Sequence, residues 1–254
     1  MKKHQVIYGK GGLPNGRHAF PPTTKARGFP RMYIIMRKFT TWIAAVALAG
    51  TMLVPMPMFC DTSTRLKTQA DGHVAAQLIQ QTDARMAEIP DCINNLLAEE
   101  GWKIYVTDKN LSRTYFNGAY RSIAGVTCPD EKKIEFESRP RAINRAYAHE
   151  VGHAFDAHFN QISYTDAWKA IYNAEKNTFR PHGAIGDNAE ISSPTEFFAS
   201  IFQDCLISPQ TCRQTAPTAY AFVQTLINQT AENYSREVQA EQQTKLVTQQ
   251  FKNS

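Results

Sequence analysis

The segment AHEVGHAFD, residues 148–156, contains residue types that can bind a metal and activate water. His149 and His153 are four residues apart, so on a helix both project from one face and can hold one ion through imidazole nitrogens. Glu150 is one step round the helix, beside the open coordination position. Zinc bound there lowers the pKa of its water, and a nearby carboxylate can move that proton to a leaving amine. The pattern predicts zinc-dependent amide hydrolysis, although a polar helix without metal could carry the same letters.

The small residues Gly152 and Ala154 favour the metal interpretation, because they allow another backbone or a third ligand to come close. A catalytic zinc site needs that third protein ligand. The metzincin pattern is excluded, because Asp156 and Phe159 stand where it requires glycine and histidine. We expect Asp156 to have a structural role.

Three downstream carboxylates remain as candidates for the third ligand: Glu175, Glu190 and Glu196. Glu196 lies in SSPTEFFAS, where Ser193 can cap a helix that has Pro194 in its first turn. A serine three residues before a glutamate is also a capping box, in which the carboxylate binds the start of its own helix. Spacing alone leaves both roles of Glu196 open.

The elements that must position these residues follow from periodicity. The apolar spacing predicts two helices broken near Pro90, a strand at 102–108, a hairpin at 113–123 around an Asn-Gly turn, and a strand at 132–138. The metal-motif helix comes next, and mainly helical patterns follow to about residue 230. The end from about Ala231 is Gln-rich and polar, which indicates a frayed helix or a tail. This order predicts an α+β domain.

The charge of the chain is unevenly distributed. Residues 1–38 carry nine Lys or Arg and no acidic residue, so the other 216 residues carry 19 basic and 23 acidic groups. Nucleic-acid binding needs basic residues clustered on a folded face, and no such cluster exists beyond the leader. We therefore exclude nucleic acid as a partner.

The leader resembles an export signal. From Met36 to Cys60 two positive charges precede an apolar core, which is typical of a signal peptide. Residues 1–35 have too few periodic apolar positions to pack, and Met36 is the better translation start. An uncleaved anchor with a basic tail, or a lipid-modified Cys60, are the alternatives. A membrane is expected as a partner only if the leader is uncleaved.

Four cysteines follow the leader, an even number in an oxidising compartment. They are interpreted as two disulfides, with Cys205 paired to Cys212 and Cys92 to Cys128, rather than as a metal cage. Buried free thiols are the alternative.

HEVGHAFD followed by SPTEFFAS resembles the catalytic domain of anthrax lethal factor and its secreted relatives, the Pro-Pro endopeptidases. The resemblance covers roughly residues 72–230. It implies a zincin-like fold with one Zn²⁺ per chain, held by His149, His153 and Glu196, and Glu150 as general base. It also implies a small sheet whose edge strand is packed on the motif helix and pairs with an extended peptide, for which the strand near residue 134 is our candidate.

Two residues depart from the family's pattern. Ser200 stands where the family has a second glutamate, four residues after the ligand, so support for a ligand must come from elsewhere. Ala189 stands where family members tend to have a tyrosine that binds the oxyanion. Tyr164, Tyr172 and His182 are the possible substitutes.

Together these features predict an exported zinc endopeptidase with a protein or peptide substrate. Its parts are a non-structural leader (1–35), a signal or anchor (36–60), a disordered linker (61–71), the peptidase domain (72–230) and a polar tail (231–254). The rivals are a zincin-like pseudo-enzyme or binding module with little turnover, and a membrane-tethered structural protein without metal.

Overall fold

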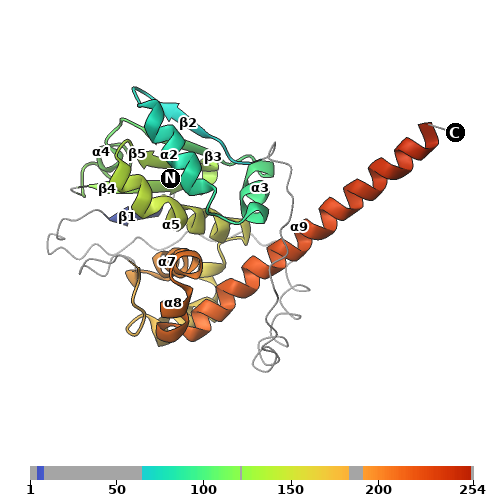
Figure 1. Cartoon of the computed structure of the whole chain (residues 1–254). Coiled ribbons are helices and arrows are strands. Elements are labelled where there is room, and N and C mark those ends of the chain that lie inside the picture. Colours follow the sequence, from blue (N-terminus) through green and yellow to red (C-terminus); the bar gives the residue numbers. More distant parts are fainter. Residues whose placement is uncertain (1–4, 9–64, 121, 183–190, 253–254) are drawn as a thin grey trace, which may run out of the picture. The chain divides into compact units, whose positions relative to one another are not determined.

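A small mixed sheet forms one half of the fold, and helix α5, Pro140–His158, packs across it (Figure 1). The computed structural model of the chain describes residues 5–8, 65–120, 122–182 and 191–252. The sheet order is β1-β4-β5-β3-β2, antiparallel from β1 to β5 and parallel from β5 to β2. The strands are β1 (Gln5–Tyr8), β2 (Thr68–Asp71), β3 (Lys103–Thr107), β4 (Ile123–Cys128) and β5 (Lys133–Glu137).

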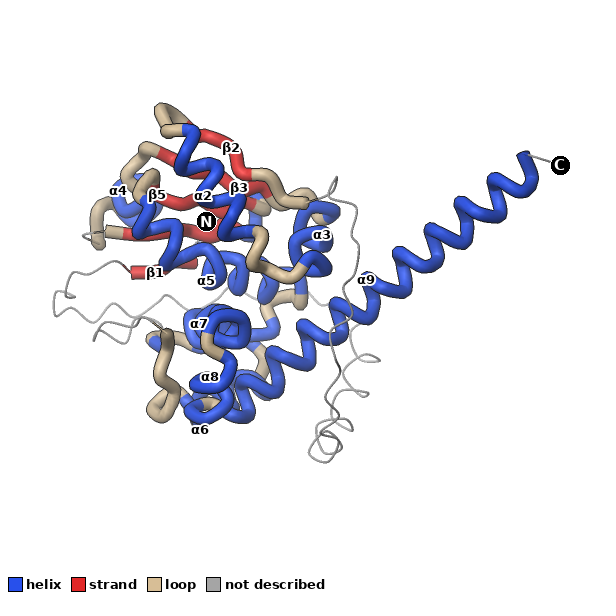
Figure 2. Tube along the Cα trace, viewed as in Figure 1, coloured by secondary structure: helices blue, strands red, loops and turns tan. Residues whose placement is uncertain are grey.

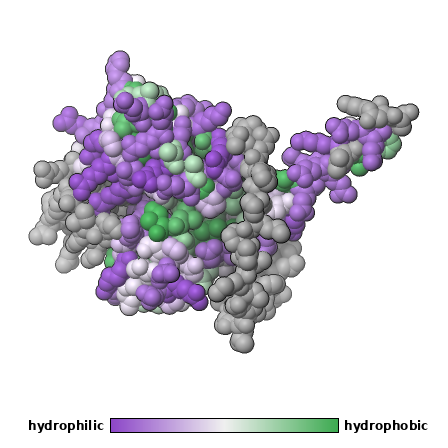
Figure 3. Space-filling view, in the orientation of Figure 1, coloured by the Kyte–Doolittle hydropathy of each residue, from purple (hydrophilic) through white to green (hydrophobic). Residues whose placement is uncertain are grey.

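Helices make up most of the rest, so the predicted α+β class is confirmed (Figure 2). The other helices are α2 (Ala76–Met86), α3 (Asp91–Glu99), α4 (Leu111–Phe116), α6 (Asp166–Glu175), α7 (Pro194–Ile207), α8 (Pro209–Thr215) and α9 (Pro217–Lys252), with 3₁₀ turns η2 (Pro129–Glu131) and η3 (Ile162–Tyr164). Helices α2 and α5 contact each other and the sheet, whereas α4 contacts β4. Figure 3 shows polar residues over the sheet half and apolar residues in a band toward α7 and α8.

The predicted hairpin at 113–123 is wrong. Residues 111–116 form α4, and Asn117 ends it in the left-handed conformation with φ 52°, followed by Gly118 at φ 75°. An Asn-Gly pair supplies positive φ to a helix C-terminus as readily as to a hairpin turn, and the local sequence does not distinguish the two.

Two segments expected to lack structure contain strands. Thr68–Asp71, in the expected linker, is β2 and pairs in parallel with β3. Its residues are mostly polar and partly exposed, so the sequence has no apolar alternation that would predict a strand here. Gln5–Tyr8, in the leader that we expected not to pack, is β1 and pairs with β4 through its backbone. The signal or anchor predicted at 36–60 lies outside the described residues.

The strand near residue 134 is not an edge strand. β5 pairs with β3 on one side and with β4 on the other, so its backbone cannot pair with a peptide. The expectation that KKIEFE is an edge strand that receives substrate is therefore wrong, and the edges of the described sheet are β1 and β2.

The described residues contain no disulfide bond. Cys92 packs in the main core, whereas Cys128 belongs to a separate apolar cluster with Leu111, Ile123 and Val126. The guessed pairing of Cys92 with Cys128 is therefore wrong. Cys205 and Cys212 are both buried thiols, and a hydrogen bond with Cys212, together with burial, raises the pKa of Cys205.

The C-terminal helix is longer than the sequence indicated. α9 runs as one helix from Pro217 to Lys252, and none of its residues after Thr230 that the structure describes is buried. No helix in the described part of the chain combines the length and apolar character needed to cross a membrane.

The contact between α5 and α7 holds the two halves together. A Cβ atom at Gly152 would lie 2.9 Å from the Ala199 Cα and 3.2 Å from the Phe202 Cβ. Only a residue without a side chain permits this approach, as the sequence analysis expected of the small residues in the motif. On α7 next to this contact, Phe198 packs edge-on against Trp168 of α6, with ring centroids 5.0 Å apart.

We expect Gly152→Ala to destabilise the fold. The extra methyl would force α5 and α7 apart at a cost of about 1–3 kcal/mol, which exceeds the gain in helix propensity of about 1 kcal/mol. Denaturant unfolding measures the difference. Arg141→Ala, on the exposed face of the same helix, is the control and should change stability by less than about 0.5 kcal/mol. Equal stability of Gly152→Ala and the parent would contradict the tight contact.

Candidate metal centre

Helix α5 brings both motif histidines to one buried surface. His149 and His153 are 1% and 0% exposed, and their apolar neighbours on the helix include Val151 and Phe155, which are fully buried. Burying two imidazoles is costly unless they bind a partner. The helix thus places two ligand-type nitrogens where only a neighbouring element can reach them.

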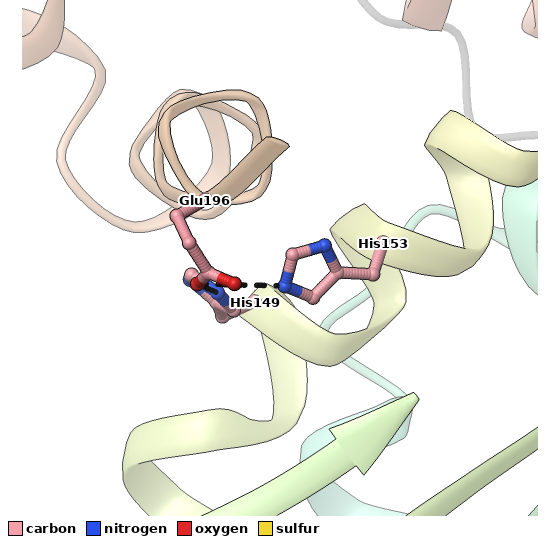
Figure 4. Close-up of side chains that lie close together, drawn as sticks. All are labelled: His149, His153 and Glu196. Atoms are coloured by element: carbon pink, nitrogen blue, oxygen red, sulfur yellow. Dashed lines mark hydrogen bonds and ion pairs between the residues drawn. The ribbon is translucent and has the colours of Figure 1, made fainter. Parts of the chain in front are cut away.

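The neighbouring element is α7, which supplies Glu196. The Ser193 hydroxyl accepts a hydrogen bond from the Glu196 backbone N–H at 3.2 Å and so caps the helix, with Pro194 in its first turn. The Glu196 carboxylate turns away from this cap. Its Oε2 lies 3.2 Å from His149 Nε2 and 3.7 Å from His153 Nε2 (Figure 4). Ser193 therefore caps the helix, whereas the Glu196 side chain does not bind back to the start of the helix as it would in a capping box.

These three side chains fit a zinc ion. Each offers one ligand atom, and the three atoms lie within 4.8 Å of one another. Tetrahedral zinc with ligand bonds of about 2.0–2.1 Å separates its ligands by about 3.3 Å, close to the observed spacing. The His153 ring is buried, and its Nδ1 has no hydrogen-bond partner among the described residues. Two imidazoles and one carboxylate form the donor set of a catalytic zinc site with an open position.

The three groups also determine one another's charge. Burial would raise the pKa of Glu196, but the positive fields and hydrogen bonds of His153 and His149 outweigh it and lower the pKa to about 2. Burial would lower the pKa of His153, and the Glu196 carboxylate outweighs it and raises that pKa. Glu196 is therefore an anion, as a metal ligand must be.

Glu150 lies between α5 and the sheet and is fully buried. Burial raises its pKa to about 8, against the field of His153 and a hydrogen bond from Thr127, which lower it. The Thr127 Oγ1 donates to Glu150 Oε2 at 2.6 Å. Glu150 Oε1 is buried and has no hydrogen-bond partner in the described residues. A carboxyl oxygen without a partner beside the ligand cluster can accept a proton from water.

Ser200 supplies the contact that its departure from the family pattern had left open. It lies one turn after Glu196 on α7, and its Oγ is 3.3 Å from His149 Nδ1. With Nε2 directed at the metal position, the Nδ1 hydrogen is available to donate to Ser200, which fixes the tautomer and the orientation of the ring. The Ser200 hydroxyl thus contacts His149 from the position at which the family pattern has a glutamate.

Other residues weighed from sequence have different roles or are not described. Glu175 accepts hydrogen bonds from the backbone N–H groups of Thr218 and Ala219 at 2.9 Å, so it caps α9 and is not a ligand. Glu190 and Ala189 lie outside the described residues. Two further candidates are not placed for catalysis.

The first of these two candidates is Tyr172. Its hydroxyl donates a hydrogen bond to the Ile191 carbonyl at 3.0 Å and therefore binds the backbone before α7. The second is Asp156, which accepts from the Ser163 N–H at 2.9 Å and from its Oγ at 2.6 Å. This ties η3 to α5 and confirms the structural role expected of Asp156. Tyr164 is 48% exposed, and the His182 N–H donates to Asp204.

Comparison with known families agrees with this geometry. Residues 125–226 match the family described as "Anthrax toxin lethal factor, N- and C-terminal domain". The predicted lethal factor resemblance is confirmed. The matched segment begins in β4, ends in α9 and contains His149, Glu150, His153 and Glu196. The predicted zincin-like fold class agrees with its arrangement of sheet, α5 and α7.

A solved structure described as the Pro-Pro endopeptidase PPEP-2 from Paenibacillus alvei is also similar. It is 22% identical, and the match covers 63% of this chain and 96% of that chain with a TM-score of 0.48. A search among curated proteins finds no match.

Sequence reasoning did not identify Thr127. No local signal marks Thr127, because its contact with Glu150 joins a strand to a helix 23 residues later. An alternation of small and hydroxyl residues on the strand before the motif would have been the only indication.

We expect Ser200→Ala to bind zinc about 10–100-fold more weakly than the parent, because His149 loses the group that orients it. Competition titration with a chromogenic chelator measures the affinity. Ser235→Ala, which removes a hydroxyl bonded to the Ala231 carbonyl on α9, is the control and should leave the affinity unchanged. Unchanged affinity in Ser200→Ala would show that the hydroxyl does not orient the histidine.

Proposed function

We propose that the chain is an exported zinc-dependent endopeptidase. His149, His153 and Glu196 hold one Zn²⁺, and Glu150 is the general base. The observation that supports this most directly is the convergence of the three buried ligand atoms beside a fourth buried carboxyl that has one oxygen without a partner. The lethal factor family match supports the same chemistry.

The chain's own residues would move the proton. A zinc ion held by His149, His153 and Glu196 would supply a Lewis acid that lowers the pKa of water. Glu150 accepts the proton of the attacking water through Oε1 and delivers it to the leaving amine nitrogen. Burial raises the pKa of this carboxyl and the positive charge of an ion lowers it, so the two effects oppose each other and favour a group that can both accept and release a proton near neutrality.

The substrate is proposed to be an extended peptide that pairs with β4. This strand carries Gly125 and Thr127, the two residues that contact Glu150. Its outer edge pairs with β1, which lies in the leader. A mature chain of residues 61–254 would lack β1, and β4 would then offer its backbone groups to a peptide.

Export is the compartment that agrees with the leader and the thiols. Removal of residues 1–60 by signal processing would release the domain, and an uncleaved leader would instead tether it to a membrane. In an oxidising compartment the neighbouring thiols of Cys205 and Cys212 would form a disulfide.

We expect about one zinc per chain in the parent after extensive dialysis, measured by elemental analysis. Glu196→Gln should lose most of the zinc because a ligand is removed, whereas Glu150→Gln should keep the zinc and lose peptide hydrolysis. Glu232→Gln, on an exposed position of α9, should keep both. Chelator should lower the melting temperature and zinc should restore it, because an ion bound only by the folded state stabilises it.

Each rival has its own signature in this experiment. A pseudo-enzyme would retain zinc but show equal, very low hydrolysis of a broad peptide library by the parent and by Glu150→Gln. A structural protein without metal would contain no zinc and would melt at the same temperature in chelator.

We further expect residues 61–254 to cleave peptides with a higher kcat/KM than the full chain, by about tenfold or more. A tethered strand competes with substrate at an effective concentration of the order of millimolar. Both chains are assayed with the same peptide library, and their zinc content is measured in parallel to show that the metal site is intact in each. Equal kcat/KM at equal zinc content would show that β1 does not compete for the β4 edge.

A further inference from the structure

Two residues of β4 form a slot for the side chain of Glu150. Gly125 and Thr127 are two positions apart on the strand, so they face the same side of the sheet, toward α5. A Cβ atom at Gly125 would lie 2.7 Å from Glu150 Cγ and 2.9 Å from Oε1. The glutamate therefore occupies the space that any side chain at residue 125 would need.

Thr127 holds the other end of the carboxyl group. It is 0% exposed, and its Oγ1 lies 2.6 Å from Glu150 Oε2 and 3.0 Å from the Glu150 backbone oxygen. A hydroxyl has one hydrogen to donate, and the shorter contact to the carboxylate is the stronger of the two. One carboxyl oxygen is thus held while Oε1 has no hydrogen-bond partner in the described part of the chain.

This arrangement matters because a glutamate side chain has three rotatable torsions, and a general base must be aligned with the proton it takes. A displacement of about 1 Å can lower a rate by about 100-fold. Among the described residues, the hydrogen bond to the Glu150 carboxyl comes from Thr127 on β4 and not from a residue of α5. Its orientation therefore depends on the strand.

We propose that Thr127 is a positioning residue for Glu150, holding Oε2 so that Oε1 faces the reacting water, with Gly125 providing the space. This inference rests on the proposed peptidase function and adds a specific role to the same site. Thr127 is not among the residues that offer a ligand atom to the metal site. It acts only through the glutamate.

The test compares Thr127→Val and Thr127→Ser in the full chain. Valine keeps the shape and removes the donor, so kcat should fall about 10–100-fold while KM, zinc content and melting temperature stay close to those of the parent. Serine keeps the donor and should restore most of kcat. Thr107→Val is the matched control, because Thr107 is also a fully buried strand threonine whose hydroxyl donates to a carboxylate, that of Asp71. It should leave kcat unchanged.

A double-mutant cycle separates this inference from the proposed function. With Glu150→Gln already present, Thr127→Val should cause no further loss of kcat, because its effect passes through Glu150. Hydrolysis by Glu150→Gln at the rate of the parent would overturn the proposed function itself. If Glu150→Gln abolishes hydrolysis but Thr127→Val leaves kcat unchanged, or lowers kcat only as much as it lowers the folded, zinc-loaded fraction, Thr127 is merely structural and this inference is wrong.

Discussion

The close approach of α5 and α7 is the contact on which the site depends. The two histidines are on one helix and the glutamate is on the other, so their ligand atoms meet only if the helix backbones nearly touch. Gly152 makes this possible, because no side chain separates it from the backbone of Ala199. Glu196 lies one turn of α7 before this contact. Ser200 lies directly after Ala199, and its hydroxyl contacts His149. A single glycine thus allows both Glu196 and Ser200 to reach the histidines.

Burial makes the site chemically distinct from the rest of the molecule. Four ionisable side chains lie within the core between the sheet and α7: His149, Glu150, His153 and Glu196. Buried charges are tolerated only when they are paired or bind metals. The histidines lower the pKa of Glu196, whereas burial dominates for Glu150 and raises its pKa. Two carboxyls a short distance apart therefore have opposite tendencies, one suited to holding an ion and the other to exchanging a proton.

The sequence predicted the local parts of this arrangement well. The i, i+4 spacing of the histidines and the apolar stripe of α5 both follow from one helix, and the Ser193 cap with Pro194 located the start of α7. The role of Glu196 came from the family resemblance, because spacing alone could not choose between a ligand and a cap. Ser200 was noted only as a departure, and its contact with His149 became visible in three dimensions.

What the sequence did not predict depends on partners distant in the chain. The Asn117–Gly118 pair ends a helix instead of turning a hairpin, and β2 forms although its residues are polar, because its order comes from backbone pairing with β3. The strand order is also a property of the whole sheet. Periodicity identified β5 as a strand but could not show that β3 and β4 would enclose it, so an internal strand was taken for an edge strand.

The separation of the metal ligands along the chain has a consequence for folding. His149 and Glu196 are 47 residues apart, so an ion that joins them closes a long loop in any state that keeps it bound. In the chain-entropy description, a covalent link closing a loop of this length restricts the unfolded chain by about 4 kcal/mol. A metal ion here would act as a reversible cross-link between the sheet half and the helical half. Its departure would remove this cross-link, while the sheet keeps its own strand pairing.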